Sequence, residues 1–189
     1  MDINILFFTD FETLDIFGPI EILERIENVN VRYISFQGGL IKSKQGYRIE
    51  TENISAINLN GVLVIPGGQG TRDLINDEEF ISQLKVLCSK AEYVLSICTG
   101  AALLAKTGLL DNRKATSNKK AFEWVKSISG NVNWIEKARW VVDDKFYTSS
   151  GVSAGMDMSL GFVSDIVGVE KANQIADNIE YTLNKKYSG

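Results

Sequence analysis

The strongest constraint on the fold is the alternation of short apolar segments with segments of helical spacing. Residues 3–8, 29–36, 61–65 and 92–96 are rich in β-branched and aromatic side chains, as buried strands are. Apolar residues recur at helical spacing in the stretches between them, most clearly over residues 77–90. Such alternation predicts an α/β fold with a mostly parallel sheet and helices on both faces.

Other elements follow from local signals. The first helix is expected to begin at or beside Pro19, because proline is tolerated in a first turn. Residues 41–50, with Gly46 in the middle, predict a hairpin off the main sheet. Further helices are expected over residues 101–106, 119–127, 154–167 and 170–185, and short strands over 132–135, 138–142 and 146–149. The 189 residues contain no internal repeat and no linker, so residues 1–189 are predicted to form a single domain.

The composition excludes several kinds of chemistry. The chain has no histidine, which rules out Ser-His-Asp and Cys-His catalysis and histidine metal sites. Its two cysteines have no CxxC spacing, so we expect neither a metal nor a disulfide framework. A net charge of −4 without a basic stripe argues against nucleic acid. The first ten residues do not resemble a signal peptide and no apolar run spans a membrane, so a cytoplasmic location is expected.

The most informative motif is the segment from Val94 to Ala102. An apolar strand, a tight turn at Cys98 and a helix of small residues resemble a nucleophile elbow. The N-terminus of the following helix should favour the thiolate of Cys98, and the N–H groups of Thr99 and Gly100 should face charge that develops on a substrate. The alternative is a buried cysteine that packs as a small hydrophobic residue, which is the interpretation we give Cys88.

The sequence Pro66-Gly67-Gly68-Gln69-Gly70 follows another buried strand, and its backbone is open to a ligand. The N–H groups of Gly67 and Gly68 are candidates for an oxyanion hole beside Cys98. An ordinary tight turn is the alternative. A dinucleotide fingerprint fits poorly, because the third glycine is absent.

Three carboxylates follow the first strand. Asp15 is the leading candidate for proton transfer, because it lies in the apolar stretch Leu14-Asp15-Ile16-Phe17 and a carboxyl buried beside a thiolate has a raised pKa. Helix capping is the alternative role for Asp15. Asp10 and Glu12 are interpreted as solvated loop residues.

These motifs together resemble the ThiJ/PfpI superfamily, whose members share a flavodoxin-like three-layer α/β core with class I glutamine amidotransferases. The Leu-Asp-x-x-Gly-Pro element, the Cys-Thr-Gly elbow and the Gly-x-x-Ala-Gly-x-Asp segment are similar to the isocyanide hydratase branch. The same elements occur in domains fused to AraC-type regulators, but no helix-turn-helix region follows here. The matching segments are Leu14-Asp15-Ile16-Phe17-Gly18-Pro19, Val64-Ile65-Pro66-Gly67-Gly68, Ser96-Ile97-Cys98-Thr99-Gly100, Ala115-Thr116 and Ser150-Gly151-Val152-Ser153-Ala154-Gly155-Met156-Asp157.

The resemblance implies that Cys98 is the nucleophile, Asp15 its acid/base partner and Thr99 an adjacent polar contact. It also implies a homodimer, a small-molecule substrate and no cofactor, and it adds Gly151 to the candidate oxyanion or substrate-binding positions. Where many relatives carry a histidine after the Ala-Thr pair, this chain has Ser117-Asn118-Lys119. Peptidase and amidotransferase chemistry, which need that histidine, are therefore disfavoured.

The favoured hypothesis is hydration of an isocyanide to an N-substituted formamide, through a thioimidate on Cys98 with Asp15 as acid and base. Phe11, Phe17 and Trp140 are candidate pocket walls, with core roles as the alternative. Two other functions remain open. One is a glyoxalase or deglycase activity on methylglyoxal, and the other is a cysteine redox sensor without catalysis.

Overall fold

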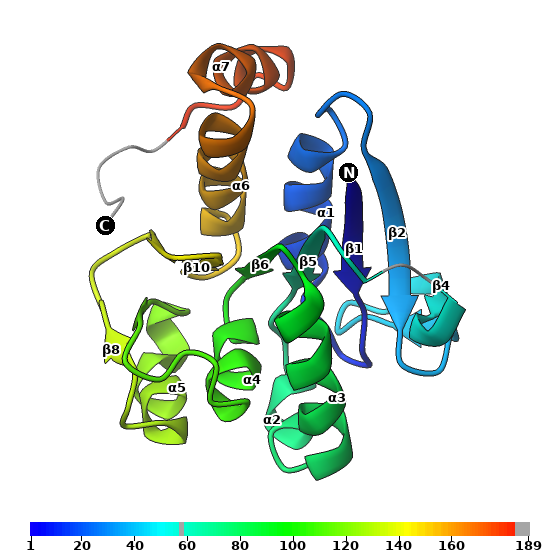
Figure 1. Cartoon of the computed structure of the whole chain (residues 1–189), viewed down its shortest axis with the longest axis vertical. Helices are drawn as coiled ribbons and strands as arrows, with labels where there is room; N and C mark the ends of the chain where they lie inside the picture. The colour runs from blue at the N-terminus through cyan, green and yellow to red at the C-terminus, as the bar shows by residue number, and fades with distance from the viewer. Residues whose placement is uncertain (57–58, 184–189) are drawn as a thin grey trace.

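The computed structural model describes residues 1–56 and 59–183 and confirms the predicted α/β class (Figure 1). Within these residues the main sheet has eight strands in the order β3-β4-β2-β1-β5-β6-β10-β9. Its strands are β1 (Asp2–Leu6), β2 (Asn30–Ser35), β3 (Gly39–Lys42), β4 (Arg48–Asn53), β5 (Val62–Ile65), β6 (Tyr93–Ser96), β9 (Trp140–Asp143) and β10 (Phe146–Ser149).

Pairing is parallel from β4 through β10, and only the two edge strands β3 and β9 run antiparallel to their neighbours. All four residues of β5 are buried, and so are the last four of β1. These central strands carry continuous apolar runs because helices cover both of their faces.

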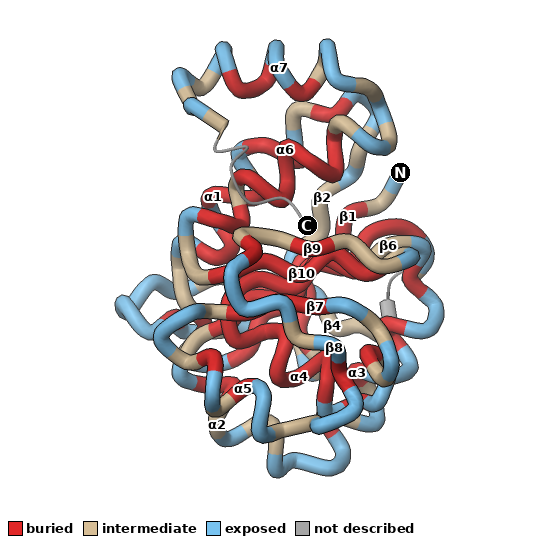
Figure 2. The backbone as a smooth tube through the Cα atoms, turned by 90° about the vertical axis from the view of Figure 1, so that its left-hand side faces the viewer, coloured by how far each residue is buried: buried red, intermediate tan, exposed pale blue. Residues whose placement is uncertain are grey.

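Helices form a layer on each side of the sheet (Figure 2). One layer contains α1 (Thr13–Leu23), α6 (Ala154–Ile166) and α7 (Val169–Asn178), and the other contains α2 (Thr71–Leu74), α3 (Glu78–Lys90), α4 (Gly100–Lys106) and α5 (Phe122–Ile128). Two short 3-10 helices, η1 (Ile54–Ala56) and η2 (Lys119–Ala121), and a small parallel sheet of β7 (Lys114–Ala115) and β8 (Asn133–Trp134) complete the described chain. None of the helices in the described residues is long and apolar enough to cross a membrane.

The prediction that the first helix begins at Pro19 was wrong. Helix α1 begins at Thr13 and contains Pro19 in its interior. The first turn is stabilised by a tertiary contact that the sequence does not reveal, in which the N–H of Thr13 donates to Oε1 of Gln45 at 3.1 Å. Pro19 has no backbone N–H and therefore removes one hydrogen bond from the interior of this helix.

Two further expectations need correction. The hairpin does not stand apart from the main sheet, because β4 pairs in parallel with β2 and extends its edge. The last helix ends at Asn178 rather than at residue 185, since Glu180 has a left-handed φ of 53° and the N–H of Tyr181 turns back to the carbonyl of Ala176. Residues 184 and 185 lie outside the described residues.

The segments that follow β1, β5 and β6 meet at the carboxyl edge of the sheet, as expected for a parallel arrangement. Phe11 pairs with Gly68, and the N–H of Glu12 donates to the carbonyl of Gly67 at 2.9 Å. The N–H of Ile97 donates to the carbonyl of Ile65 at 2.9 Å. These bonds place Asp15, Gly67 and Cys98 beside one another.

Candidate active site

Cys98 occupies a strained corner between β6 and α4. Its φ is +56°, a conformation that typically costs a non-glycine residue roughly 1–3 kcal/mol. Its N–H faces the carbonyls of Ser149 and Ser150, both at 3.2 Å, and its own carbonyl accepts from Oγ of Ser117 at 2.7 Å. The surroundings thus hold Cys98 in the geometry expected of a nucleophile elbow.

Two glycines allow the corner to form. A Cβ on Gly100 would lie 2.6 Å from the carbonyl oxygen of Ile65, and a Cβ on Gly67 would lie 2.5 Å from the N–H of Thr99. Both contacts are with backbone, which cannot move aside cheaply. Glycine at these positions therefore lets the elbow pack directly against the end of β5.

Asp15 lies on α1 with no exposed surface. Its Oδ2 accepts a hydrogen bond from the N–H of Gly67 at 2.9 Å. Its Oδ1 makes no hydrogen bond of ordinary length with the described residues. The thiol of Cys98 and the backbone of Val152 lie near enough to the carboxyl group for both to favour its charged form. Asp15 does not cap the helix, so the capping alternative is wrong.

Burial dominates the electrostatics of this pair. It raises the pKa of Asp15 to about 7, against the opposing hydrogen bond from Gly67. Burial, together with the charge of Asp15, also raises the pKa of Cys98 to about 12. The expectation of a thiolate was therefore wrong, because desolvation by burial outweighs the hydrogen bonds that favour the charged form of Cys98. Near neutral pH the pair is therefore a thiol beside a carboxyl group whose pKa is raised towards neutrality.

Asn118 supplies the side-chain donor to the sulfur. Its Nδ2 lies 3.1 Å from Sγ of Cys98, while its Oδ1 accepts from the N–H of Ala121 at 3.2 Å and so fixes the orientation of the amide. Gly151 lies beside this amide, and a Cβ on Gly151 would lie 2.1 Å from Nδ2. The absence of a side chain at Gly151 thus makes room for the amide of Asn118.

The predicted backbone oxyanion donors are largely occupied. The N–H of Gly67 is bonded to Asp15, that of Gly68 to Oγ1 of Thr99 at 3.0 Å, and that of Gly100 to the carbonyl of Ile97 at 2.9 Å. These N–H groups position the elbow instead of facing a substrate. The hydroxyl of Thr99 binds the Gly68 loop, and the backbone of Thr99 faces the sulfur.

Val152 is a site residue that the sequence analysis missed. Its backbone faces both Asp15 and Cys98 and favours the charged form of each. Its φ is +48°, an outlier for a β-branched residue. Strain at both Cys98 and Val152 is concentrated where the chemistry is expected. The valine side chain carries no sequence signal of this role.

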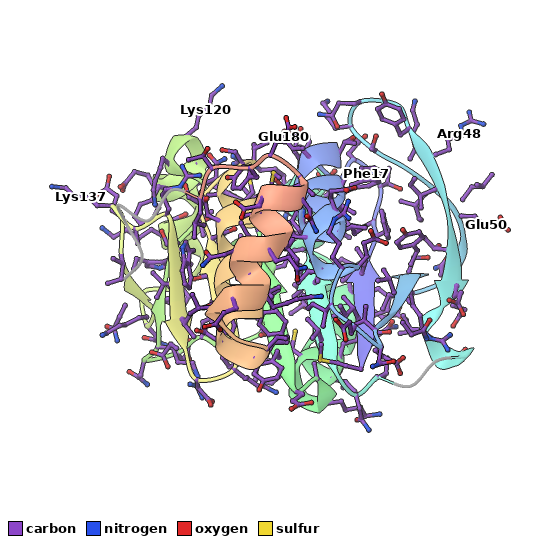
Figure 3. All side chains as sticks on the ribbon, turned by 90° about the horizontal axis from the view of Figure 1, so that it is seen from above. Phe17, Arg48, Glu50, Lys120, Lys137 and Glu180 are labelled. Atoms are coloured by element: carbon purple, nitrogen blue, oxygen red, sulfur yellow. The ribbon has the colours of Figure 1, made fainter. Side chains whose placement is uncertain are left out.

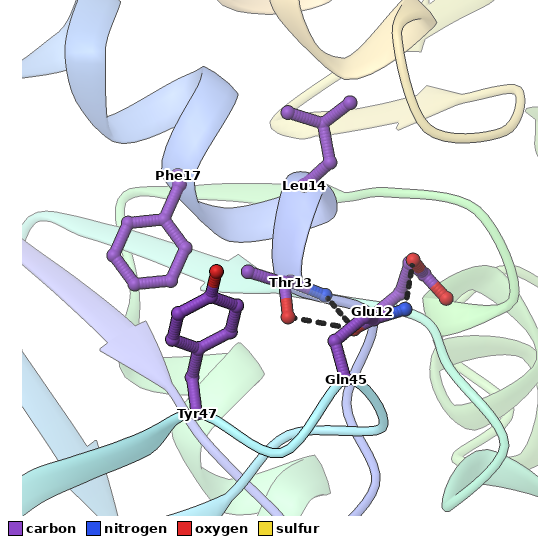
Figure 4. A pocket seen from close by; sticks show the side chains of 6 residues that line it. All are labelled: Glu12, Thr13, Leu14, Phe17, Gln45 and Tyr47. Atoms are coloured by element: carbon purple, nitrogen blue, oxygen red, sulfur yellow. Dashed lines mark hydrogen bonds between the residues drawn. The ribbon is translucent and has the colours of Figure 1, made fainter.

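Cys98 opens into a cavity of about 340 Å³ whose lining includes Glu12, Gln69 and Thr99. None of the predicted aromatic walls is among the residues that line it. Phe11 is fully buried in the core against Phe7, and Trp140 packs on Gly161 of α6. Phe17 lies instead in a separate, apolar pocket with Leu14 and Tyr47 (Figure 4).

The second cysteine and the nearby carboxylate of Glu12 have a structural role or a hydrogen-bond partner within the protein. Cys88 is buried within α3, as expected for a packing residue, and burial raises its pKa to about 12. Glu12 is half-buried and accepts a hydrogen bond from Gln45. Within residues 1–56 and 59–183, no three His, Cys, Asp or Glu side chains gather in a way that could hold a metal ion.

The chain is similar to a family model, to curated proteins and to a solved structure. The model of the DJ-1/PfpI family matches residues 1–165. An isonitrile hydratase from Pseudomonas putida is 28% identical over 96% of this chain and 78% of its own length, and a deglycase from Pyrococcus horikoshii is 30% identical over 77% and 89%. The crystal structure of a ThiJ/PfpI family protein from Pseudomonas syringae superposes with a TM-score of 0.87 at 25% identity, over 98% of this chain and 77% of the other.

Proposed function

Since the chain belongs to the DJ-1/PfpI family, a family that includes enzymes, we propose that it is a cysteine-dependent hydratase of isocyanides. The observation that carries this proposal is the buried pair of Cys98 and Asp15 in a chain without histidine. A carboxyl group whose pKa is raised to about 7 is matched to proton transfer near neutral pH.

In the first step the thiol of Cys98 adds to the terminal carbon of R–N≡C. A carbon–sulfur bond forms, the S–H proton passes to Asp15, and Asp15 delivers a proton to the same carbon. The product is a thioimidate, R–N=CH–S–Cys98. The amide of Asn118, 3.1 Å from the sulfur, stabilises the negative charge that develops there.

In the second step water attacks the thioimidate carbon, and Asp15 accepts a proton from that water. Asp15 passes that proton to the nitrogen. The carbon–sulfur bond then breaks, and the remaining proton of the attacking water passes from the new hydroxyl through Asp15 to the sulfur of Cys98. The products are R–NH–CHO and the free thiol, so the overall reaction consumes one water and regenerates the enzyme. Covalent catalysis divides one difficult hydration into two easier additions.

The proposal is tested by following formamide formation from several aryl and alkyl isocyanides. We expect turnover by the wild type and none by Cys98→Ala. Cys88→Ala is the matched control, because Cys88 is equally buried but lies within α3, away from the cavity. Absence of turnover with every isocyanide, or full activity in Cys98→Ala, would eliminate the proposal.

A second candidate is a deglycase or glyoxalase activity on methylglyoxal-type carbonyls. The 30% identity to a pyrococcal deglycase favours it. Asn118 counts against it, because an amide cannot act as the general base that a histidine supplies. Lactate formation from methylglyoxal separates this candidate from isocyanide hydration.

We also propose a homodimer and a reducing, cytoplasmic environment. The exposed apolar side chains of Leu14, Phe17 and Tyr47 form a surface suited to a second copy of the chain. Cys88 and Cys98 are both free, and the mechanism needs Cys98 reduced. Sedimentation of the wild type and of Phe17→Asp tests the dimer; a monomeric wild type would refute it.

A further inference from the structure

The Cys98 cavity is lined by more positive than negative side chains. Lys44, Arg72 and Lys120 are the cations that line it, and Glu12 is the one carboxylate. The chain as a whole has the opposite balance, with 24 acidic and 20 basic residues. The cations are contributed by separate segments, namely the β3–β4 loop, α2 and η2. The mouth of this cavity therefore concentrates positive charge on an otherwise acidic protein.

Arg72 is the best positioned of the three. It is half-buried, and its guanidinium lies 3.7 Å from the centre of the Trp124 ring, which limits its freedom. No carboxylate among the described residues forms an ion pair with Arg72, Lys44 or Lys120. Glu12, the acid at the same cavity, is instead hydrogen-bonded to Gln45 at 2.6 Å. The planar donors of Arg72 are thus available to an external anion.

From this arrangement we infer that the substrate of the Cys98 site is an anion, with a carboxylate-sized group at the end remote from the carbon that Cys98 attacks. Arg72 binds that group, and Lys44 and Lys120, both exposed, attract it from solution. The anionic group must lie away from the thiol because buried Asp15 would repel it there. If the substrate is an isocyanide, we expect an aryl or alkyl isocyanide that carries a carboxylate at its far end. This more specific version of the inference rests on the proposed function.

The first test does not depend on turnover. Alkylation of Cys98 by 4-(iodoacetamido)benzoate is compared with alkylation by the uncharged 4-(iodoacetamido)benzamide, with glutathione as the reference thiol. Mass spectrometry of the Cys98 peptide gives both rates. We expect the wild type to prefer the anion over the amide by at least about tenfold relative to glutathione, the scale of a charge-assisted hydrogen bond. Salt at about 0.5 M should reduce the preference.

Variants identify the group responsible. Arg72→Gln should lose most of the preference while its rate with the uncharged probe stays near that of the wild type, and Arg72→Lys should keep part of it. Arg48→Gln is the matched control, because Arg48 is exposed on the opposite side of the molecule from Lys120 (Figure 3). An equal or lower relative rate for the anion in the wild type, failure of both probes to reach Cys98, or a preference that survives Arg72→Gln would overturn the inference.

A second measurement separates this inference from the proposed function. Turnover of 4-isocyanobenzoate is compared with turnover of its methyl ester. Anion preference in alkylation without turnover of either isocyanide would leave the anion site standing and remove the hydratase. Equal turnover of both, with no preference in alkylation, would leave the hydratase standing and remove the anion site.

Discussion

Asp15→Asn is expected to make the protein more stable and less active at the same time. The carboxyl of Asp15 has no exposed surface, and burial raises its pKa from 3.8 to about 7. The folded state therefore binds this proton more tightly than the unfolded state does. The contribution of the Asp15 carboxyl to the free energy of unfolding is most favourable below pH 3.8 and is lost as the pH rises to about 7.

The size of the effect follows from the shift. Because burial raises the pKa of Asp15 from 3.8 to about 7, and each unit corresponds to roughly 1.4 kcal/mol, ionising Asp15 costs the fold on the order of 4 kcal/mol above neutral pH. Asparagine carries no charge, and its side-chain oxygen can still accept from Gly67. Asp15→Asn should therefore raise the free energy of unfolding by up to that amount at about pH 8.5, and by little at about pH 4.

Urea denaturation of both proteins at the two pH values measures this difference, and the comparison cancels the titration of the groups that Asp15 does not influence. Asp157→Asn is the control, because we expect it to change the free energy of unfolding in the opposite direction. Asp157 is equally buried but ion-paired with Arg139, so its neutralisation should destabilise the protein. If Asp15→Asn is no more stable than the wild type at pH 8.5, the argument that the site holds a costly buried carboxylate is refuted.

The remaining predictions concern the sulfur and its neighbours. Asn118→Ala removes the side-chain donor to the sulfur and should slow alkylation of Cys98 by roughly tenfold, as measured with iodoacetamide. Gly151→Ala should have the same effect with near-normal stability by thermal unfolding, because its Cβ would meet the movable end of Asn118. Gly67→Ala should instead destabilise the protein by roughly 2 kcal/mol or more in urea, because its Cβ would meet backbone. Since burial raises the pKa of Cys98, hydrogen peroxide should oxidise it no faster than free cysteine; selective oxidation by micromolar peroxide would revive the redox-sensor alternative.

Much of the site was predictable from local sequence because it depends on local geometry. The elbow at Cys98 follows from an apolar strand, a turn and small residues, and these features alone place the sulfur at the corner. The position of Asp15 follows from a charge within an apolar stretch and from the convergence of loops at one edge of a parallel sheet.

What sequence reasoning missed depends on burial and on long-range pairing. Whether the cysteine of such an elbow is a thiolate or a thiol depends on the solvent exposure of its sulfur. The sequence around Cys98 does not reveal that exposure. The N–H groups of Gly67 and Gly68 were expected to be free, because their partners, Asp15 and Thr99, lie more than thirty residues away. Val152 acts on Asp15 and Cys98 through its backbone, and the identity of its side chain does not predict this role.

The state of the buried pair restricts the chemistry that the site can favour. The thiol of Cys98 favours the charged form of Asp15, whereas the charge of Asp15 raises the pKa of Cys98. The pair therefore holds at most one charge near neutral pH, and the nucleophile becomes an anion only as its proton leaves. Such a site suits a substrate that accepts both the sulfur and the proton. The terminal carbon of an isocyanide takes both, whereas a carbonyl takes sulfur at carbon and the proton at oxygen. A single carboxyl beside the sulfur can therefore serve the addition of the thiol to an isocyanide without a second proton donor, and this is the physical reason why we propose that reaction for a site without histidine.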